Sequence, residues 1–365
     1  MGLTDGLTFY FFTFAAIGLT LFATIYWKKI YRKSALNFIV RLFIIVLCQA
    51  LALVSVGLQI NRSNGFFESW NDLFGGSSNY SQTAVQADSI SFLTKQDLTK
   101  AESLSNKSKL VRDVITGKNS QVSNIVYIDL PSIAVKKIEN NVALDSHRFR
   151  VIEFLTGFPS EPIMWVKVLK IDRQLALYNK SHIGHEIIGV FPQVNIAGNY
   201  DLECMNLPSP QPAAETWLST DMHSYLGSRL GLRDSKWGIM GVSTGGWCAA
   251  MLSIRHPDLY SAAVSIAGYY RPALPRKDPV ALQLAMDKKY DLTSAELLLT
   301  EKQHLYITAS LGDKYSIRET RKFLAKQHPN LAITYKELPS GGHNSRVWVP
   351  LIPNALDWLQ RNIAV

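Results

Sequence analysis

The stretch Met240-Gly241-Val242-Ser243-Thr244-Gly245-Gly246-Trp247 decides the fold of this chain. It carries the pattern G-x-S-x-G, which follows an apolar run and precedes a segment of helical periodicity. A serine at a tight turn from strand to helix has a strained backbone, and only small neighbours avoid a clash there. The context favours Ser243 as a nucleophile, with the N–H of Thr244 at the helix start as a donor to a developing oxyanion. An ordinary glycine turn is the alternative.

Two candidate partners of Ser243 follow along the chain. Asp313 lies in the loop after the predicted strand Leu305–Ala309, and His343 lies in the loop after the predicted strand Ile333–Glu337. In a triad of this kind, the histidine takes the serine proton and the acid orients the imidazole. The order Ser, Asp, His along the chain is that of α/β-hydrolases. A simple turn aspartate and a plain loop histidine are the alternatives.

Two further site residues are predicted, a second oxyanion donor and an alternative acid. Gly157-Phe158-Pro159 follows the predicted strand ending at Thr156, and the N–H of Phe158 is the candidate second oxyanion donor because Pro159 has none. Glu319 is the alternative acid if Asp313 is only a turn residue.

Short β-rich runs alternate with helical patterns from about residue 120 onward. Several runs are continuously apolar, as expected when helices cover both faces of a parallel sheet. The sequence therefore predicts an α/β domain over 119–365, with a doubly wound, mostly parallel sheet. The predicted strands are Asn124–Asp129, Phe149–Thr156, Ile187–Phe191, Trp237–Met240, Ala262–Ile266, Leu305–Ala309 and Ile333–Glu337, and the predicted helices are Glu215–Leu230, Gly246–His256 and Ser316–Gln327.

Together these residues resemble a known family. The region Ile187–Gly268 is similar to the esterase D/antigen 85 (mycoloyltransferase-like) branch of the α/β-hydrolases. The resemblance implies a serine esterase or acyltransferase without a cofactor. It also implies a triad of Ser243, Asp313 and His343, with the Phe158 and Thr244 amides as oxyanion hole. The segments that carry it are Ile188–Pro192, Glu215–Leu218, Gly241–Gly246, Arg255–Tyr260 and Gly341–His343.

The same resemblance extends to the acidic segment Asp201-Leu202-Glu203-Cys204. In some actinobacterial relatives a similar cysteine pairs with one just after the nucleophile, which here is Cys248. This implies a 204–248 disulfide at the rim of the site, with two free thiols as the alternative. Asp201 and Glu203 are expected either to bind a polyol acceptor or to be solvated surface carboxylates.

The N-terminal region is predicted to be a membrane anchor over 1–60. Thr8–Trp27 and Leu42–Ile60 are uncharged and long enough to cross a hydrocarbon core, so both are predicted to be transmembrane helices. The basic residues at 28–33, and Arg41, place the connecting loop in the cytoplasm and the C-terminal domain outside it. A cleaved signal peptide is the alternative for the first segment.

A polar region connects the two parts, and it is predicted to be a linker or stalk over 61–118. Gly75-Gly76-Ser77-Ser78-Asn79 is typical of a tether, and apolar spacing from Asp97 to Val114 predicts one helical piece. Within the catalytic domain, the segment from Arg271 to about Leu299 is predicted to form a lid that sets the acyl size.

Composition excludes other classes. The net charge of +9 comes partly from the basic residues of the anchor, and the rest of the chain has no basic stripe, so nucleic-acid binding has little support. His182 and His185 match no zinc-protease order, so no metal site is predicted.

The sequence therefore predicts a multi-pass cell-membrane protein with an extracytoplasmic serine esterase domain. Its substrate is an acyl-ester small molecule or an envelope lipid. The alternatives are an acyltransferase that uses a sugar hydroxyl as acceptor, a serine peptidase on the same fold, and a non-catalytic hydrolase-like scaffold.

Overall fold

The computed structural model describes residues 6–30, 35–64, 70, 92–104, 107–198, 200–293, 301–326 and 328–364. It divides the chain into two compact units, Met1–Asn79 and Tyr80–Val365. The predicted tether at Gly75–Asn79 lies outside the described residues.

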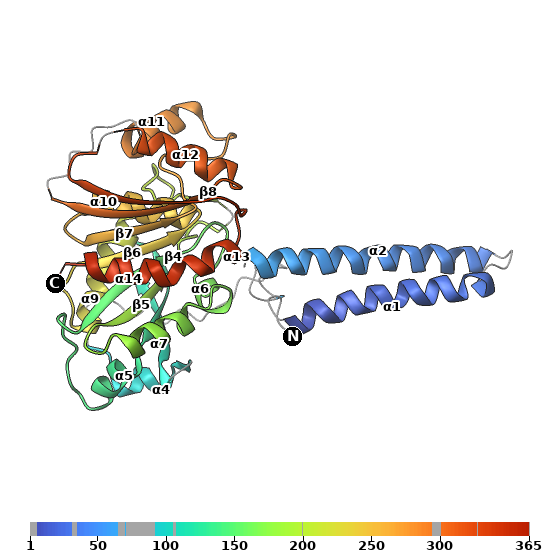
Figure 1. Ribbon diagram of the computed structural model, residues 1–365, viewed down its shortest axis with the longest axis horizontal. Coiled ribbons are helices and arrows are strands. Elements are labelled where there is room, and N and C mark those ends of the chain that lie inside the picture. The colour runs from blue at the N-terminus through green and yellow to red at the C-terminus, as the bar shows by residue number, and fades with distance from the viewer. Residues whose placement is uncertain are drawn as a thin grey trace. The chain divides into compact units, whose positions relative to one another are not determined.

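The first unit contains two long helices, α1 (Gly6–Ile30) and α2 (Ala35–Asn64), which lie side by side and antiparallel (Figure 1). The hydroxyl of Thr20 in α1 lies 3.7 Å from the Sγ of Cys48 in α2. The segments Gly6–Lys28 and Leu36–Arg62 are long and apolar enough to cross a membrane, a test that a signal sequence would also pass. Each helix extends beyond the span predicted from its uncharged core.

The second unit is built on one nine-stranded sheet of order β1-β2-β3-β5-β4-β6-β7-β8-β9. The six strands from β5 to β9 along this order are parallel to one another, and β1, β2 and β3 add an antiparallel end. All seven predicted strands are present, so the predicted α/β sheet is confirmed. The strands are β1 (Glu102–Ser103), β2 (Lys109–Thr116), β3 (Ser123–Leu130), β4 (Phe149–Leu155), β5 (Glu186–Pro192), β6 (Trp237–Val242), β7 (Tyr260–Ile266), β8 (Gln303–Ser310) and β9 (Leu331–Leu338).

Helices connect these strands and bury both faces of the sheet. The three predicted helices are confirmed with shifted ends, and the first contains a π-helical turn, η2 (Trp217–Met222). Besides η2, the described helices of the second unit are α4 (Lys95–Thr99), α5 (Ser132–Glu139), α6 (Met164–Lys167), α7 (Ile171–Ser181), α8 (Ala214–Thr216), α9 (His223–Leu230), α10 (Thr244–Arg255), α11 (Val280–Tyr290), α12 (Lys314–Leu324), α13 (Ser345–Trp348), η3 (Val349–Leu351) and α14 (Ile352–Asn362).

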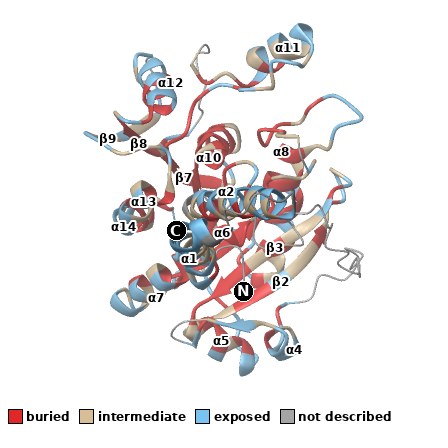
Figure 2. Ribbon diagram, turned by 90° about the vertical axis from the view of Figure 1, so that its right-hand side faces the viewer, coloured by how far each residue is buried: buried red, intermediate tan, exposed pale blue. Residues whose placement is uncertain are grey.

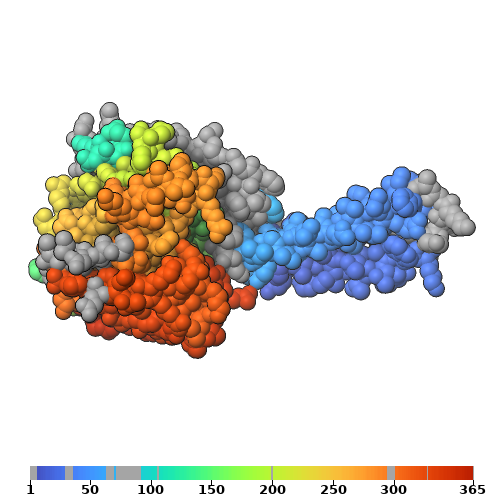
Figure 3. Space-filling model, turned by 90° about the horizontal axis from the view of Figure 1, so that it is seen from above, coloured from blue at the N-terminus to red at the C-terminus, as the bar shows by residue number. Residues whose placement is uncertain are grey.

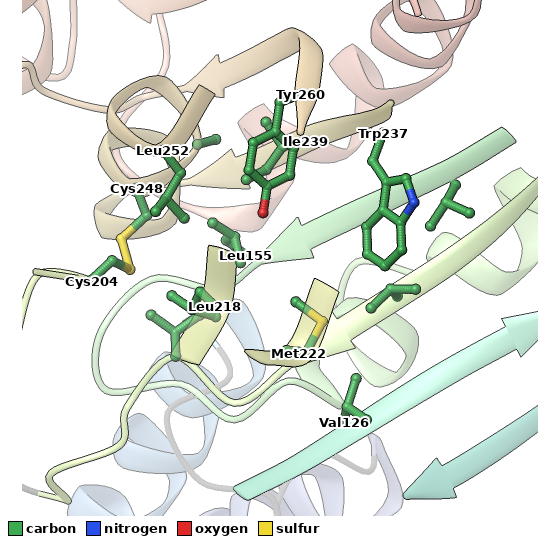
Figure 4. Packing of buried hydrophobic residues seen from close by; sticks show 14 of the residues in the cluster. Val126, Leu155, Cys204, Leu218, Met222, Trp237, Ile239, Cys248, Leu252 and Tyr260 are labelled. Carbon is green, nitrogen blue, oxygen red and sulfur yellow. A yellow bond between two sulfur atoms is a disulfide. The ribbon is translucent and has the colours of Figure 1, made fainter. Parts of the chain in front are cut away.

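Successive side chains along the strands point to opposite faces of the sheet and pack into two separate hydrophobic cores. In β6, Trp237 and Ile239 join the cluster that contains α9 and α10, while Met240 and Val242 join the cluster that contains α6, α7 and α14. The central strands and α10 are buried along nearly their whole length (Figure 2). Figure 4 shows Trp237, Ile239 and Tyr260 packed among side chains from η2 and α10. This packing fixes β6 and α10, and therefore the turn between them.

The predicted helix Asp97–Val114 is wrong beyond Thr99. Residues 95–99 form α4, but the chain then enters β1 and β2, and β2 pairs with β3 along its whole length. Leu110 and Val111 are both buried but belong to the cores on opposite faces, which is the alternation of a strand. Tertiary pairing therefore overrides the helical spacing, and the described residues from 92 to 118 belong to the second unit instead of a linker.

Candidate active site

Ser243 occupies a strained turn between β6 and α10. Its φ of 59° and ψ of −125° lie outside the regions that side-chain-bearing residues favour. Its N–H donates to the carbonyl of Ile266 at 2.9 Å, which ties the turn to the end of the neighbouring strand β7. The turn therefore holds the serine at the carboxyl ends of the parallel strands, where sites in open α/β sheets form.

The two flanking glycines of the motif are required by close approach of backbone. A Cβ on Gly241 would lie 1.9 Å from the carbonyl oxygen of Gly245, and a Cβ on Gly245 would lie 2.2 Å from the carbonyl oxygen of Leu155. Neither neighbour is a flexible side-chain end, so any larger residue would displace the turn. The motif thus has the steric basis that its spacing predicted.

His343 lies between Ser243 and Asp313. Its Nε2 is 2.7 Å from Oγ of Ser243, and its Nδ1 is 2.5 Å from Oδ2 of Asp313. An ionised carboxylate only accepts hydrogen bonds, so Nδ1 carries the hydrogen and Nε2 is left free to accept the serine hydroxyl. The ring of Trp348 meets the imidazole edge-on at 5.0 Å between centroids. The three residues are therefore arranged as a hydrogen-bonded chain.

Asp313 is the acid beside His343, and the alternative Glu319 is not. Asp313 caps α12 by accepting the N–H of Ser316 at 3.2 Å. Burial alone would raise the pKa of Asp313, but the hydrogen bond and charge of His343, together with backbone N–H groups, outweigh it and lower the pKa. Glu319 instead pairs with Arg318 at 2.8 Å and with Lys322 at 2.9 Å.

The loop after β4 lies against the serine from the other side. A Cβ on Gly157 would lie 2.9 Å from Cβ of Ser243, so the backbone of Gly157 borders the nucleophile, and Phe158 is the next residue in this loop. The loop is braced because the carbonyl of Ser160 accepts the side-chain amide of Asn195 at 2.7 Å. Thr244, the first residue of α10, and Gly157 therefore approach Ser243 from two different segments. Asn195 was not singled out in the sequence, since nothing marks a brace of this kind.

The rim of the site contains the disulfide that the resemblance implied. Cys204 and Cys248 are bonded, and both are buried beside α10 (Figure 4). Cys48 in α2 is free. The expectation of a solvated surface carboxylate is wrong for Glu203, which is only 3% exposed. Oη of Tyr269 lies 2.8 Å from Oε1 of Glu203. The sequence did not single out Tyr269, because a tyrosine that follows a buried strand resembles an ordinary core residue.

The predicted lid begins as an extended segment and continues into α11. A cleft of about 220 Å³ lies between the segment that begins at Arg271 and helix α12. Tyr315, which is two residues after Asp313 in the sequence, lines this cleft. Figure 3 looks onto this end of the unit and shows α11 and α12 as neighbouring parts of the surface. The last part of the predicted lid, 294–299, lies outside the described residues.

The remaining predicted positions form no second chemical centre in the described residues. His182 stacks on Tyr178 with 3.9 Å between ring centroids, and its Nδ1 lies 3.0 Å from the carbonyl oxygen of Tyr178. Within the described part of the chain, no three His, Cys, Asp or Glu side chains gather in a way that would hold a metal ion.

Comparison with known proteins assigns the family. The model of the family described as "Putative esterase" matches residues 145–359, more than half of the chain, and this stretch contains the serine, the histidine and the aspartate. The chain belongs to this esterase family. It is therefore an enzyme of the hydrolase or acyltransferase class, and the resemblance drawn from the sequence is confirmed at the level of family and fold.

Several solved structures share the fold of this chain. A ferulic acid esterase superposes with a TM-score of 0.57 at 16% identity, over 70% of this chain and 99% of the other. An S-formylglutathione hydrolase from Agrobacterium tumefaciens superposes with a TM-score of 0.59 at 13% identity, over 72% of this chain and 98% of the other. The MPT51 protein of Mycobacterium tuberculosis superposes with a TM-score of 0.51 at 16% identity, over 72% of this chain and 99% of the other. Identities this low relate the folds alone.

A relative by sequence is an uncharacterized protein of Corynebacterium glutamicum. It is 22% identical over 225 residues, which cover 58% of this chain and 52% of the relative. The esterase described here thus spans about half the length of that protein.

Proposed function

We propose that this esterase is a membrane-anchored, extracytoplasmic serine hydrolase that cleaves carboxylic esters through an acyl-enzyme. The observation that carries the proposal is the position of His343, 2.7 Å from Oγ of Ser243 and 2.5 Å from Asp313. The family match over 145–359 supports an ester as the substrate.

The arrangement supports a two-stage reaction. Oγ of Ser243 attacks the ester carbonyl while Nε2 of His343 takes its proton, and the ionised Asp313 stabilises the imidazolium that forms. The N–H groups of Thr244 and Phe158 receive the negative charge on the carbonyl oxygen. His343 then returns the proton to the departing alcohol, which leaves the acyl group on Ser243. In the second stage water attacks this ester while His343 takes its proton, the bond from the acyl carbon to Oγ of Ser243 breaks, His343 returns the proton to Oγ, and the carboxylic acid leaves.

Two observations support the location. The helices α1 and α2 are long and apolar enough to span a membrane, and the basic residues between them favour the cytoplasmic side. The disulfide Cys204–Cys248 is typical of an oxidising compartment, which agrees with a catalytic domain outside the cytoplasm.

The test is fluorophosphonate labelling of the full chain in detergent beside Ser243→Ala, with turnover of p-nitrophenyl esters of rising chain length. Labelling and turnover in the wild type that vanish in the variant are expected. A folded wild type without either would overturn the proposal in favour of a non-catalytic scaffold. A sugar added to the same assay separates hydrolysis from transfer, because an acylated sugar appears only if the acyl-enzyme accepts a hydroxyl other than water.

A further inference from the structure

A buried carboxyl is linked by hydrogen bonds to the start of α10, and the reaction proposed above does not use it. Glu203 is 3% exposed, and its two oxygens have separate partners. The N–H of Ala273 donates to Oε2 at 2.9 Å, and Oη of Tyr269 lies 2.8 Å from Oε1. Both partners come from the segment that leads from β7 toward α11, so Glu203 holds the start of the predicted lid.

The backbone around Glu203 is strained and fixed on several sides. Glu203 and Cys204 have φ values of 54° and 57°, in the left-handed region that favours glycine. The carbonyl of Glu203 accepts the indole N–H of Trp247 in α10 at 3.0 Å, and the next residue is tied to α10 by the disulfide to Cys248. Strain held this firmly is typical of a position with a role beyond packing.

The contacts continue from Glu203 to the residue that follows the serine. Oη of Tyr269 also lies 3.2 Å from Oγ1 of Thr244, and Oγ1 of Thr244 lies 3.4 Å from Oδ2 of Asp201. The phenol has one hydrogen and can donate it to only one of its two neighbours. The direction of the chain therefore depends on whether Glu203 carries a proton.

Burial raises the pKa of Glu203, and the nearby carboxylate of Asp201 raises it further. As the neutral acid, Glu203 donates from Oε1 to Tyr269, Tyr269 donates to Thr244, and Thr244 donates to Asp201. Oη of Tyr269 and Oγ1 of Thr244 then each donate one hydrogen bond and accept one, and Oε2 of Glu203 still accepts the N–H of Ala273. Once Glu203 ionises, the phenol must turn its hydrogen to the carboxylate, and Thr244 loses its donor.

Charged and titratable groups reach Glu203 from several elements. Asp201 lies on the same loop, Tyr269 follows β7, and Tyr200 and Tyr315 sense its charge from the preceding loop and from α12. The three tyrosines have raised pKa values and stay neutral below strongly alkaline pH. Asp201 is therefore the group among them that brings charge to Glu203 near neutral pH.

We infer that Glu203 is a positioning residue: as a neutral acid it orients Tyr269 and, through it, Thr244, and so holds the oxyanion donor and the start of the lid in one geometry. This inference rests on the proposed function, because it assigns the N–H of Thr244 to the oxyanion. It adds a hydrogen-bonded chain from Glu203 through Tyr269 to Thr244. This chain connects the oxyanion donor to Ala273 at the start of the predicted lid.

The experiment compares Glu203→Gln and Tyr269→Phe with wild type, in the full chain in detergent. The amide introduced by Glu203→Gln cannot ionise but keeps one donor and one acceptor, whereas Tyr269→Phe keeps the ring against Trp247 and removes the hydroxyl. The matched controls are Glu337→Gln and Tyr335→Phe, from an exposed Tyr–Glu pair at 2.8 Å on β9. The readouts are kcat and KM for a small soluble ester across neutral and alkaline pH.

In wild type, kcat is expected to fall severalfold on the alkaline side as Glu203 ionises, and this fall should be absent in Glu203→Gln. Tyr269→Phe should lower kcat at neutral pH with little change in KM, since the donor to the transition state is misplaced while the binding surface is kept. The controls should follow wild type. Identical pH profiles for wild type and Glu203→Gln would overturn the inference.

A second measurement does not depend on turnover. A carboxyl with a raised folded pKa contributes stability that is fully present below the unfolded pKa, about 4.3 for glutamate, and is lost as the pH rises from there to the folded pKa. The melting temperature of wild type should therefore fall relative to Glu203→Gln as the pH is raised from mildly acidic to alkaline, and a constant difference would contradict a neutral Glu203. Absent fluorophosphonate labelling of wild type would instead refute the proposed function, and the melting comparison would still test the protonation state.

Discussion

Asp313 and Glu203 are two buried carboxyls near the nucleophile turn, and their pKa values shift in opposite directions. Asp313 faces His343, which becomes a cation during the reaction, and its pKa is lowered. Glu203 faces Asp201, and its pKa is raised. Tyr269 and Tyr315 connect the two regions through an edge-to-face contact at 5.6 Å. Burial penalises both carboxylates, so the partner decides which one remains ionised.

The largest effect should come from removing the charge of Asp313. Asp313→Asn keeps the size of the side chain, but an amide that donates to Nδ1 favours the wrong tautomer of His343, so kcat should fall by about 10⁴-fold. Ester turnover measures this directly. Glu203→Gln should cost far less at neutral pH, because the amide resembles the neutral acid.

Glu319→Gln is the control for Asp313→Asn, since Glu319 pairs with Arg318 and Lys322 instead of the imidazole. If Glu319→Gln abolished turnover while Asp313→Asn retained it, Asp313 would not be the catalytic acid. The comparison between Asp313 and Glu203 would then no longer hold.

The next effect should come from the disulfide, which fixes the loop of Glu203 and has no counterpart beside Asp313 in the described residues. Replacing Cys204 and Cys248 by serine should lower the free energy of unfolding by about 3–4 kcal/mol, since the bond joins positions with a sequence separation of 44. Denaturant titration of the full chain measures the loss. The looser loop should also admit water to Glu203 and bring its pKa closer to the usual value.

Cys48→Ser provides the matched control, because Cys48 is a free thiol in α2. It should leave the unfolding of the catalytic domain unchanged. Equal stability of the double variant and wild type would remove the disulfide as the reason why Glu203 stays buried.

The two carboxyls also differ in how far the sequence could reveal them. Asp313 is predictable because the chain order and the strand-end position of each triad member are local signals. Glu203 stands out only as part of a cysteine-containing segment, which suggested an acceptor-binding or a surface position. Its partners Tyr269 and Ala273, and Thr244 beyond Tyr269, come from other segments, and only the folded chain brings them together. No spacing rule encodes such a meeting.

The same contrast applies to the fold. The parallel strands were predictable because several of them are continuous apolar runs between turn signals. β2 was not, because Leu98, Leu104, Leu110 and Val111 also fit a helical spacing. Only the pairing of β2 with β3 makes the strand the better state. Such a strand depends on pairing with its neighbour, and the apolar spacing within the segment does not reveal this pairing.

The smallest effect should come from Glu215, a third carboxyl that extends the comparison to a site without chemistry. Its oxygens accept from Arg255 at 2.7 Å, from Tyr290 at 2.7 Å and from His256 at 3.0 Å. Burial opposes ionisation, but these partners outweigh it and lower the pKa of Glu215 to about 2. Glu215→Gln should therefore cost about 1–2 kcal/mol of stability at neutral pH, since the partners are themselves partly solvated.

The pH dependence of that cost is the sharper test. A carboxyl with a lowered pKa contributes stability that is present above the unfolded pKa, about 4.3 for glutamate, and is lost as the pH falls toward about 2. The gap between wild type and Glu215→Gln should close over this range, opposite in sign to the alkaline change expected for Glu203. Glu301→Gln, from an exposed pair with Lys236, should show almost no gap. A gap for Glu215 that stayed constant with pH would mean that packing, and not ionisation set by the partners, distinguishes these buried acids.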